Sequence, residues 1–156
     1  ISKCLMLHAR LEGCASRKPA IYLNAQAMNA RAETLKCPPG CHLCCIETEM
    51  ALTWDDVKRI ENLGFRRSEF SEFRGGFLRL RNVNGRCFFL GEKGCIIYEA
   101  RPIGCRAYPV IYSEELGACI LDPLCPAKET VSSDEFVEKC RLVLSALPNL
   151  IRSPEY

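Results

Sequence analysis

Four thiols fall within nine residues in the segment Cys37-Pro38-Pro39-Gly40-Cys41-His42-Leu43-Cys44-Cys45. Cys41 and Cys44 have the two-residue spacing of a chelating turn, in which a tight backbone directs two thiolates toward one metal ion. The adjacent residues Cys44 and Cys45 cannot form an ordinary unstrained disulfide with each other, and free thiols that pack as small apolar groups would not be this dense. The segment therefore predicts a metal site, and disulfides fit the pattern poorly.

Four cysteines in the second half of the chain are candidates for the remaining ligands. The complete candidate set is Cys37, Cys41, Cys44, Cys45, Cys87, Cys95, Cys105 and Cys125. These eight thiols could fill two four-thiolate sites, or fill one site and leave redox-active spares. In a regular hairpin with Leu90 opposite Cys95, Cys87 would face the other side of the sheet, so Cys87 and Cys95 would serve different sites unless a bulge intervenes.

Two arginines flank one of the candidate ligands, in the segment Arg101-Pro102-Ile103-Gly104-Cys105-Arg106-Ala107-Tyr108-Pro109. A centre with four thiolates carries a net charge of about −2, which a dry interior penalises unless cations and hydrogen-bond donors surround it. We therefore expect Arg101 or Arg106 to donate to ligand sulfurs or to Glu99. The alternative is that Arg101 pairs with a surface carboxylate. His42 is expected to be an exposed residue of the chelating turn rather than a ligand.

Length and composition predict one soluble domain. The chain has 156 residues, 12 of them cysteines, and its 21 Lys and Arg against 19 Asp and Glu give a formal charge of +2. This balance excludes a strongly basic DNA-binding domain, although residues 58–86 are locally basic, so nucleic-acid binding has weak support. No apolar run approaches the length of a membrane helix, and we expect a cytoplasmic protein with no membrane partner.

The first half of the chain is expected to be mainly helical. Apolar side chains recur at helical spacing over residues 4–14 and 19–35. Residues 47–52 alternate weakly, like a short strand, and Thr53 with Asp56 predicts a capped helix that runs through Leu63 and stops at Gly64. Residues 65–86 are interpreted as a basic loop region fixed to the core by its phenylalanines, with stacking on nucleic-acid bases as the sharper alternative.

The second half is expected to contain two hairpins and a final helix. Residues 86–90 and 95–98 form one strand pair, and residues 107–112 and 117–121 form the other. The last helix begins at Ser132, with Glu135 completing a capping box, and ends before Pro148. Its buried stripe is expected to include Cys140 as a core residue, whereas Cys119, in a strand, is a weak ligand candidate. The fold class is therefore α+β, with helices and short hairpins around a cysteine-ligated centre.

The joint pattern resembles the CxxCxxCC cysteine-cluster family, which is described as a zinc- or iron-chelating domain. The resemblance is carried by Cys37-x3-Cys41-x2-Cys44-Cys45, Cys87-Phe-Phe-Leu, Gly94-Cys95-Ile-Ile-Tyr98-Glu99, Arg101-Pro102-x2-Cys105-Arg106-x-Tyr108-Pro109 and Cys125-Pro126. It spans residues 37–126 and leaves residues 1–36 and 132–148 as helical extensions of a single domain. The resemblance implies a metal-binding function. One relative is the flagellin lysine methylase, a longer protein, but this chain has no recognisable S-adenosylmethionine fingerprint.

Ordinary hydrolase, kinase and dehydrogenase functions lack support, because no catalytic triad, phosphate-binding loop, dinucleotide fingerprint or HExxH motif is present. The favoured interpretation is a cysteine-ligated iron–sulfur cluster, of the 4Fe-4S type, used for redox or cluster-assisted chemistry such as methyl transfer with a protein partner. Arg101, Arg106 and Tyr108 are expected to lie beside it. The alternatives are a zinc-stabilised module that contacts protein or nucleic acid, and a metal storage or delivery protein.

Overall fold

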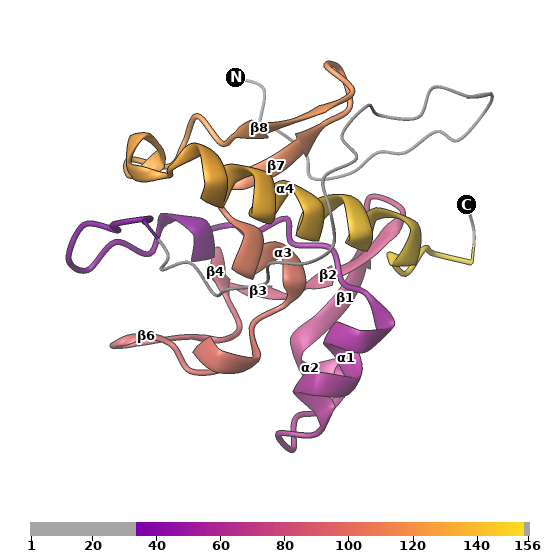
Figure 1. The fold of residues 1–156 in the computed structure, drawn as a ribbon. Helices are drawn as coiled ribbons and strands as arrows, with labels where there is room; N and C mark the ends of the chain where they lie inside the picture. Colours follow the sequence, from indigo (N-terminus) through magenta and orange to yellow (C-terminus); the bar gives the residue numbers. More distant parts are fainter. Residues whose placement is uncertain (1–33, 155–156) are drawn as a thin grey trace, which may run out of the picture.

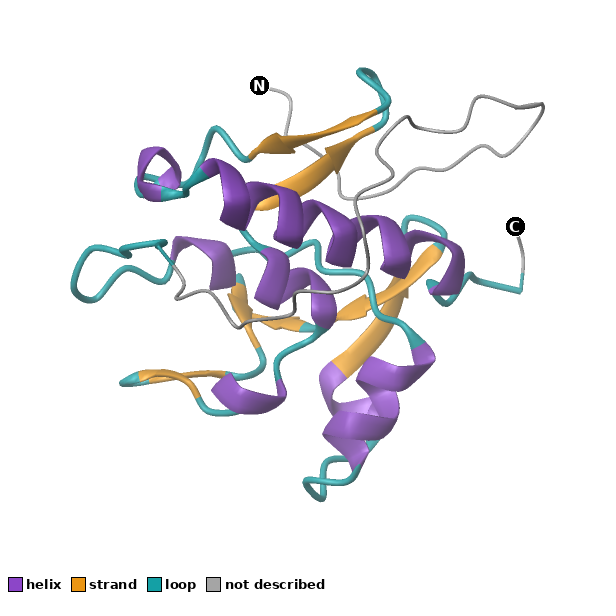
Figure 2. Ribbon diagram, viewed as in Figure 1, coloured by secondary structure: helices purple, strands orange, loops and turns teal. Residues whose placement is uncertain are grey.

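The computed structural model describes residues 34–154, in which helices pack with short antiparallel strand pairs in an α+β arrangement (Figures 1 and 2). The α-helices are α1 (Trp54–Glu61), α2 (Arg67–Phe70), α3 (Ile103–Ala107) and α4 (Ser133–Ala146), and the 3-10 turns are η1 (Leu43–Cys45), η2 (Tyr98–Ala100), η3 (Lys128–Thr130) and η4 (Leu147–Asn149). None of the helices within residues 34–154 has the length and apolar character needed to cross a membrane.

The helix expected over residues 4–14 lies outside the described part of the chain, as does most of the helix expected over residues 19–35. Thr34 and Leu35, at the end of the second one, are not helical. They run alongside the start of α4, where the carboxylate of Glu135 accepts hydrogen bonds from the backbone N–H of Thr34 at 2.8 Å and of Leu35 at 3.1 Å. Those N–H groups are therefore used by a distant side chain rather than by a helical turn.

The capped start of α1 is confirmed. The Thr53 side chain accepts a hydrogen bond from the backbone N–H of Asp56, and the Asp56 carboxylate accepts one from the backbone N–H of Thr53. The helix ends at Glu61, and Gly64, with φ of 96°, follows in the turn as expected. A positive φ of this kind costs glycine little, which is why the helix stops here.

The prediction of a strand over residues 47–52 is wrong, because the segment contributes only an isolated bridge between Ala51 and Arg79. Its backbone groups are shared between two neighbours: Leu52 donates its N–H to Leu78 at 2.9 Å and accepts from Ile151 at 3.0 Å. Residues 65–86 are also more regular than expected. They contain α2 and the hairpin of β1 (Ser71–Arg74) with β2 (Phe77–Leu80), in which Phe70 and Phe77 are buried and Phe73 is exposed.

The hairpin expected over residues 86–98 is divided between two strand pairs. β4 (Arg86–Cys87) pairs with β3 (Asn82–Val83), whereas β5 (Leu90–Gly91) pairs with β6 (Gly94–Cys95). The predicted register of Leu90 opposite Cys95 is confirmed. The turn at Phe88 and Phe89 separates β4 from β5, so the alternation argument that placed Cys87 and Cys95 on opposite faces does not apply.

The second predicted hairpin is confirmed as β7 (Val110–Ser113) paired with β8 (Ala118–Leu121). Residues 107–109 are not part of it, because α3 extends to Ala107 and a turn at Tyr108 and Pro109 follows. In Figure 1, α4 runs across the molecule between this hairpin and α3. The hairpin and α3 thus share one helix as their support.

The helix α4 begins as predicted, because the Ser132 side chain accepts a hydrogen bond from the backbone N–H of Glu135 at 3.2 Å. The expected capping box is incomplete, since the Glu135 carboxylate binds Thr34 and Leu35 instead. The apolar stripe expected on this helix is confirmed only in part: Val143 is buried and Phe136, Cys140 and Leu147 are partly buried, whereas Val137 and Leu144 are exposed. The buried face also contains Glu135, Lys139 and Ala146.

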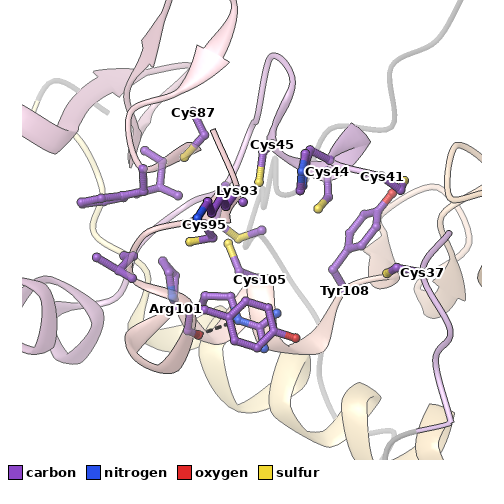
Figure 3. A pocket seen from close by; sticks show the side chains of 18 of the residues that line it. Cys37, Cys41, Cys44, Cys45, Cys87, Lys93, Cys95, Arg101, Cys105 and Tyr108 are labelled. Carbon is purple, nitrogen blue, oxygen red and sulfur yellow. Dashed lines mark hydrogen bonds between the residues drawn. The ribbon is translucent and has the colours of Figure 1, made fainter. Parts of the chain in front are cut away.

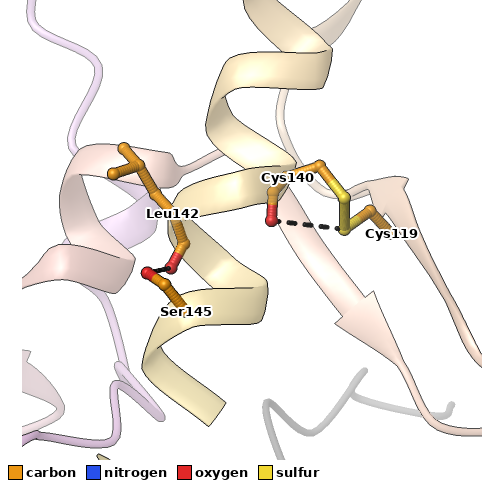
Figure 4. Close-up of a disulfide and its surroundings, with 4 residues drawn as sticks. All are labelled: Cys119, Cys140, Leu142 and Ser145. Atoms are coloured by element: carbon orange, nitrogen blue, oxygen red, sulfur yellow. Dashed lines mark hydrogen bonds between the residues drawn. A yellow bond between two sulfur atoms is a disulfide. The ribbon is translucent and has the colours of Figure 1, made fainter. Parts of the chain in front are cut away.

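Cys119 and Cys140 form a disulfide that joins β8 to α4, with a Cα–Cα distance of 5.8 Å (Figure 4). The expectation that Cys140 is a free thiol is therefore wrong, whereas the cysteines of the 37–45 segment form no disulfide. The signal was absent from local sequence, because the two residues are 21 positions apart and meet only where the hairpin packs on the helix. Cys119 is thereby removed from the set of candidate ligands.

The main core lies between α1, the β1–β2 hairpin and the turn at Phe88 and Phe89. Its largest fully buried apolar side chains include Phe70, Phe89, Leu52 and Ile60. Phe65 and Phe89 pack edge to face with ring centroids 5.1 Å apart. Cys87 belongs to this cluster, and Cys45, Cys95 and Cys105 pack against it, so the core forms one wall beneath the cysteines.

Candidate metal centre

Seven of the eight predicted ligands line one cavity of about 440 Å³ (Figure 3). They come from the segment before α1, from β4 and β6, and from α3, and they are Cys37, Cys41, Cys44, Cys45, Cys87, Cys95 and Cys105. The eighth, Cys125, is buried but does not line this cavity. The structure thus brings together thiols that are up to 68 positions apart in the sequence, counted from Cys37 to Cys105.

The first four thiols are positioned by two consecutive turns. The backbone N–H of Cys41 donates to Pro38 at 3.0 Å, and Gly40, with φ of 71°, supplies the positive φ of that turn. The backbone N–H of Cys45 then donates to His42 at 2.9 Å, which forms η1. His42 lines the cavity and packs against Gly94. A Cβ atom on residue 94 would lie 3.4 Å from the Cε1 atom of His42.

Cys87 and Cys95 are held in place by the turn between their strands. The backbone N–H of Phe88 donates to the backbone carbonyl of Arg81 at 2.9 Å, and the backbone N–H of Ile96 donates to the backbone carbonyl of Phe89 at 2.9 Å. Because the Phe89 side chain is fixed in the core, this turn brings β4 and β6 to the same cavity. The two thiols therefore line one cavity without a bulge, because the strand expected over residues 86–90 is broken at Phe88 and Phe89.

Cys105 is held by a hydrogen-bond network that begins at the first turn of α1. The buried Asp56 carboxylate accepts from the backbone N–H of Ile103 at 2.9 Å. It also pairs with Arg59, whose guanidinium donates to the carbonyls of Ala100 at 3.3 Å and Arg101 at 3.2 Å. The capping residue of one helix therefore orients the loop that leads into the next.

The other end of α3 is fixed by α4. The Lys139 ammonium group is buried and donates to the carbonyls of Arg106 at 3.3 Å and Tyr108 at 3.0 Å. It also pairs with Glu135 at 3.3 Å. Burial alone would raise the pKa of Glu135, but hydrogen bonds from Thr34 and the charge of Lys139 outweigh it, so this pKa lies below its ordinary value. This pair connects the segment before the cysteine run to the Cys105 helix.

The thiols of the cavity lie close enough to influence one another. A hydrogen bond with Cys45, followed by burial, raises the pKa of Cys44. Burial is the largest cause of the raised pKa values of Cys87, Cys95 and Cys105, and repulsion between neighbouring thiolates adds to it. A cation that replaces the protons would remove this repulsion, which is the chemical reason for metal binding here.

Backbone N–H groups point at three of the sulfurs in the same way. The N–H of the residue two positions later, Phe89 for Cys87 and Ile97 for Cys95, forms a hydrogen bond that lowers the thiol pKa. Ala127 does the same for Cys125. Backbone donors to thiolate sulfurs stabilise their negative charge, as the surroundings of metal-bound cysteines do.

Of the two predicted arginines, only Arg101 lines the cavity. Its charge opposes the rise in the pKa values of Cys44, Cys95 and Cys105. Its Nε atom donates to the Tyr98 carbonyl at 2.8 Å, and its guanidinium lies 3.6 Å from the Tyr98 ring centroid, so Arg101 contacts Tyr98 and not Glu99. Arg106 is exposed and does not line the cavity, whereas Tyr108 does line it, as predicted.

Several residues that line or support the site are not predicted to do so from the sequence. Lys93 and Tyr98 contribute to the cavity wall, and Asp56, Glu135 and Lys139 orient the segments that carry the thiols. The sequence predicts Asp56 and Glu135 as helix-capping residues and gives them no role in the site. Their partners lie 47 and 101 residues away, in Ile103 and Thr34.

The basic segment of residues 58–86 is largely balanced within the fold. Carboxylates pair with five of its arginines, in the pairs Arg59–Asp56, Arg66–Glu69, Arg74–Glu72, Arg79–Glu49 and Arg81–Glu72. Arg79 is fully buried. Five arginines of this segment are therefore paired within the fold, whereas the side chains of Lys58, Arg67 and Arg86 are exposed.

Within residues 34–154, no three Cys, His, Asp or Glu side chains are arranged closely enough to hold a metal ion as they stand. The donor set nevertheless fits one, because seven soft thiol donors, an adjacent cation and backbone N–H groups surround a single cavity. Thiolates of this kind select zinc, copper(I) or iron–sulfur clusters over hard cations such as magnesium.

Comparisons with known proteins give one match, to a family model. No curated protein and no solved structure matches the chain. The matching model covers residues 36–140, which is more than half of the chain and includes all eight predicted ligands. On that match, the chain belongs to the CxxCxxCC family, described as "Putative zinc- or iron-chelating domain".

Proposed function

We propose that the protein is a metalloprotein whose cavity holds a cysteine-ligated iron–sulfur cluster of the 4Fe-4S type. The observation that carries this proposal is the convergence of seven thiols on one cavity of about 440 Å³. A zinc ion with sulfurs at about 2.3 Å needs a sphere of only about 50 Å³ and four ligands. The volume of the cavity favours a larger sulfur-bridged centre over a single zinc ion.

The surroundings suit a cluster that changes charge. The apolar side chains of Met50, Leu80, Phe89 and Ile97 form part of the wall and limit the access of water. The N–H groups of Phe89 and Ile97 donate to ligand sulfurs, and Arg101 supplies a positive charge at the rim. These three factors, solvent exposure, hydrogen bonds to sulfur and local charge, set the reduction potential of thiolate-ligated clusters.

When bound, such a cluster supplies one-electron redox chemistry or a site for cluster-assisted reactions. The residues of this chain would then ligate it, exclude water and compensate its charge. We propose that the protein acts with a protein partner that supplies or accepts the electron, or that carries a group-transfer step such as methyl transfer.

The test is to purify the protein anaerobically and to measure iron, zinc and acid-labile sulfide per chain with the visible absorption spectrum. We expect about four iron and about four sulfide per chain, with absorption at ~400 nm, for a thiolate-ligated cluster. Zinc alone, with no sulfide after iron-replete expression and anaerobic reconstitution, would contradict the proposal and make this a zinc-stabilised module. The Cys95→Ser variant should lose the iron signal, and the Cys119→Ser, Cys140→Ser double variant is its control outside the cavity.

A further inference from the structure

Five basic side chains around the cavity make no ion pair within the described part of the chain. Each of them lines the cavity or is next in sequence to a residue that lines it, and they are Lys36, Arg86, Lys93, Arg101 and Arg106. Lys93 and Arg101 reach the cavity itself (Figure 3), and all of the five except Arg101 are exposed. These exposed charges remain available to a partner when a metal centre occupies the cavity.

Only two carboxylates, Glu92 and Glu99, hold the same kind of position without a basic partner among residues 34–154. The balance is reversed elsewhere, since residues 107–154 contain seven Asp and Glu against four Lys and Arg. The positive charge is therefore concentrated on the turns that carry the thiols. A charge distribution of this kind steers an oppositely charged partner to one part of the molecule.

Exposed apolar side chains belong to the same turns. Leu43 is 56% exposed, Ile96 is 62% exposed and Tyr98 is 53% exposed. Tyr98 lines the cavity, and Leu43 and Ile96 each lie between two lining residues in the chain. The contact of His42 with Gly94 joins the turn of Leu43 to the hairpin of Ile96. An apolar centre with a charged rim is the usual composition of a protein–protein interface.

These features favour a protein over a nucleic acid as the partner. Leu43 and Ile96 are aliphatic and offer no ring for stacking on a base, and one face of the Tyr98 ring is covered by Arg101 at 3.6 Å. The exposed carboxylates of Glu92 and Glu99 would repel phosphates. On a protein surface they could accept hydrogen bonds from the partner.

We propose that the turns around the cavity form a docking surface for an acidic redox protein. The docking surface consists of Lys36, Leu43, Lys93, Ile96, Tyr98 and Arg101. Its occupant has carboxylates around an apolar spot, and it gives one electron to the cluster or takes one from it, with no bond formed or broken. The redox step rests on the proposed function. Small and salt-sensitive contacts are typical of such partners, which must separate after the transfer.

The test is a calorimetric titration of the metal-loaded protein with a plant-type ferredoxin chosen for its acidic surface. We expect a dissociation constant of about 10 to 100 μM at low salt, and about tenfold weaker binding at ~150 mM salt. Lys93→Glu should weaken binding about tenfold, because it places a like charge opposite the partner's carboxylates. Ile96→Ser should weaken binding about fivefold at both salt concentrations, because it removes apolar contact without changing charge.

Lys58→Glu is the matched control, because Lys58 is exposed on α1 and the variant changes the net charge by the same amount. It should weaken binding by less than about twofold. The metal content of each variant is measured first, so that loss of binding is not confused with loss of the site. If Lys93→Glu loses its metal, Lys93→Gln with Lys58→Gln as its control decides the matter.

Several outcomes would overturn the docking surface. These are no binding of ferredoxin at low salt, an equal loss in Lys93→Glu and Lys58→Glu, and binding of the basic protein cytochrome c as tightly as ferredoxin. A single-stranded oligonucleotide that binds more tightly than ferredoxin, and that Lys93→Glu weakens, would instead make these turns a nucleic-acid interface.

Failure of the docking surface can be distinguished from failure of the proposed function. A protein that contains iron and sulfide but does not bind ferredoxin keeps the cluster and loses the docking surface. A protein that contains zinc without sulfide loses the cluster, and the same titration still tests the surface. Binding that Lys93→Glu weakens and Lys58→Glu does not would then retain the acidic partner and remove its redox step.

Discussion

At the scale of single residues, Arg101 is the side chain whose charge acts most directly on the thiols. It lines the cavity, and its guanidinium is fixed on the Tyr98 ring. It lowers the pKa values of Cys95 and Cys105 against the effect of burial. The sequence predicted an arginine near the centre but could not choose between Arg101 and Arg106.

Replacing Arg101 with Gln should make the metal easier to lose in acid. Without the positive charge the thiol pKa values rise, protons compete for the sulfurs at a higher pH, and the midpoint of metal release should move up by roughly 0.5 to 1 pH unit. Metal release can be followed by absorption during an anaerobic pH titration. Arg106→Gln is the matched control, and equal midpoints for the two variants would show that Arg101 has no such role.

At the scale of elements, α4 supports the site from a distance. Lys139 donates to two carbonyls at the end of α3, and Glu135 accepts from Thr34 and Leu35 just before the cysteine run. Both residues are buried, Glu135 at 8% and Lys139 at 6% exposure. Breaking a buried pair by removing one partner costs more than the pair itself contributes, because a buried charge is left without compensation.

Lys139→Met should therefore lower the free energy of unfolding by about 3 kcal/mol. It should also weaken metal retention, because the carbonyls of Arg106 and Tyr108 lose their donor and α3 carries Cys105. Urea unfolding and a chelator competition measure the two effects. Glu138→Gln, at an exposed position of the same helix, should change stability by less than about 0.5 kcal/mol, and a similar loss in both variants would contradict this role.

The disulfide belongs to the same scale, because it fastens β8 to α4. Closing a loop of 21 residues stabilises a fold by about 3 kcal/mol in the chain-entropy model. The Cys119→Ser, Cys140→Ser double variant should lose this amount in urea unfolding and retain its full metal content. Reduced wild-type protein is the matched reference and should unfold at the same urea concentration as the variant. Loss of metal from the variant would show that these two cysteines are not separate from the site.

At the scale of the whole molecule, the raised thiol pKa values link metal binding to folding. Burial raises the pKa of Cys87, Cys95, Cys105 and Cys125 above the ordinary value of 9.0. In metal-free protein this contribution to stability is complete below about pH 9, where the thiols of the unfolded chain are also protonated. It is lost as the pH rises further, because the unfolded chain ionises first.

Metal-free and metal-loaded protein should therefore respond to pH in opposite directions. The metal-free form should lose up to about 1.4 kcal/mol per pH unit above pH 9 for each thiol that ionises only after unfolding. The metal-loaded form should instead become less stable in acid, because protons displace the metal from the thiolates. Urea unfolding at pH 7 and pH 10 with and without a chelator distinguishes them. A metal-free Cys87→Ser, Cys105→Ser variant should show a shallower loss, and an unchanged slope would refute the assignment to these thiols.

The sequence by itself determined the family, the candidate thiols and the capped starts of α1 and α4. These signals are local, because a chelating turn, a capping box or a two-residue alternation is complete within a few positions. The match to residues 36–140 agrees with the segment in which the cysteine spacing was recognised. For the same reason the sequence predicted the register of Leu90 opposite Cys95 and the pairing of β7 with β8.

Only the tertiary structure decided which thiols lie together. Cys87 and Cys95 share a cavity because the core fixes Phe89, and Cys119 meets Cys140 because a hairpin packs on α4. The contact between Glu135 and Thr34 spans 101 residues. Contacts of this length depend on how the elements pack and not on the pattern within any one of them, so no spacing rule along the chain could predict them.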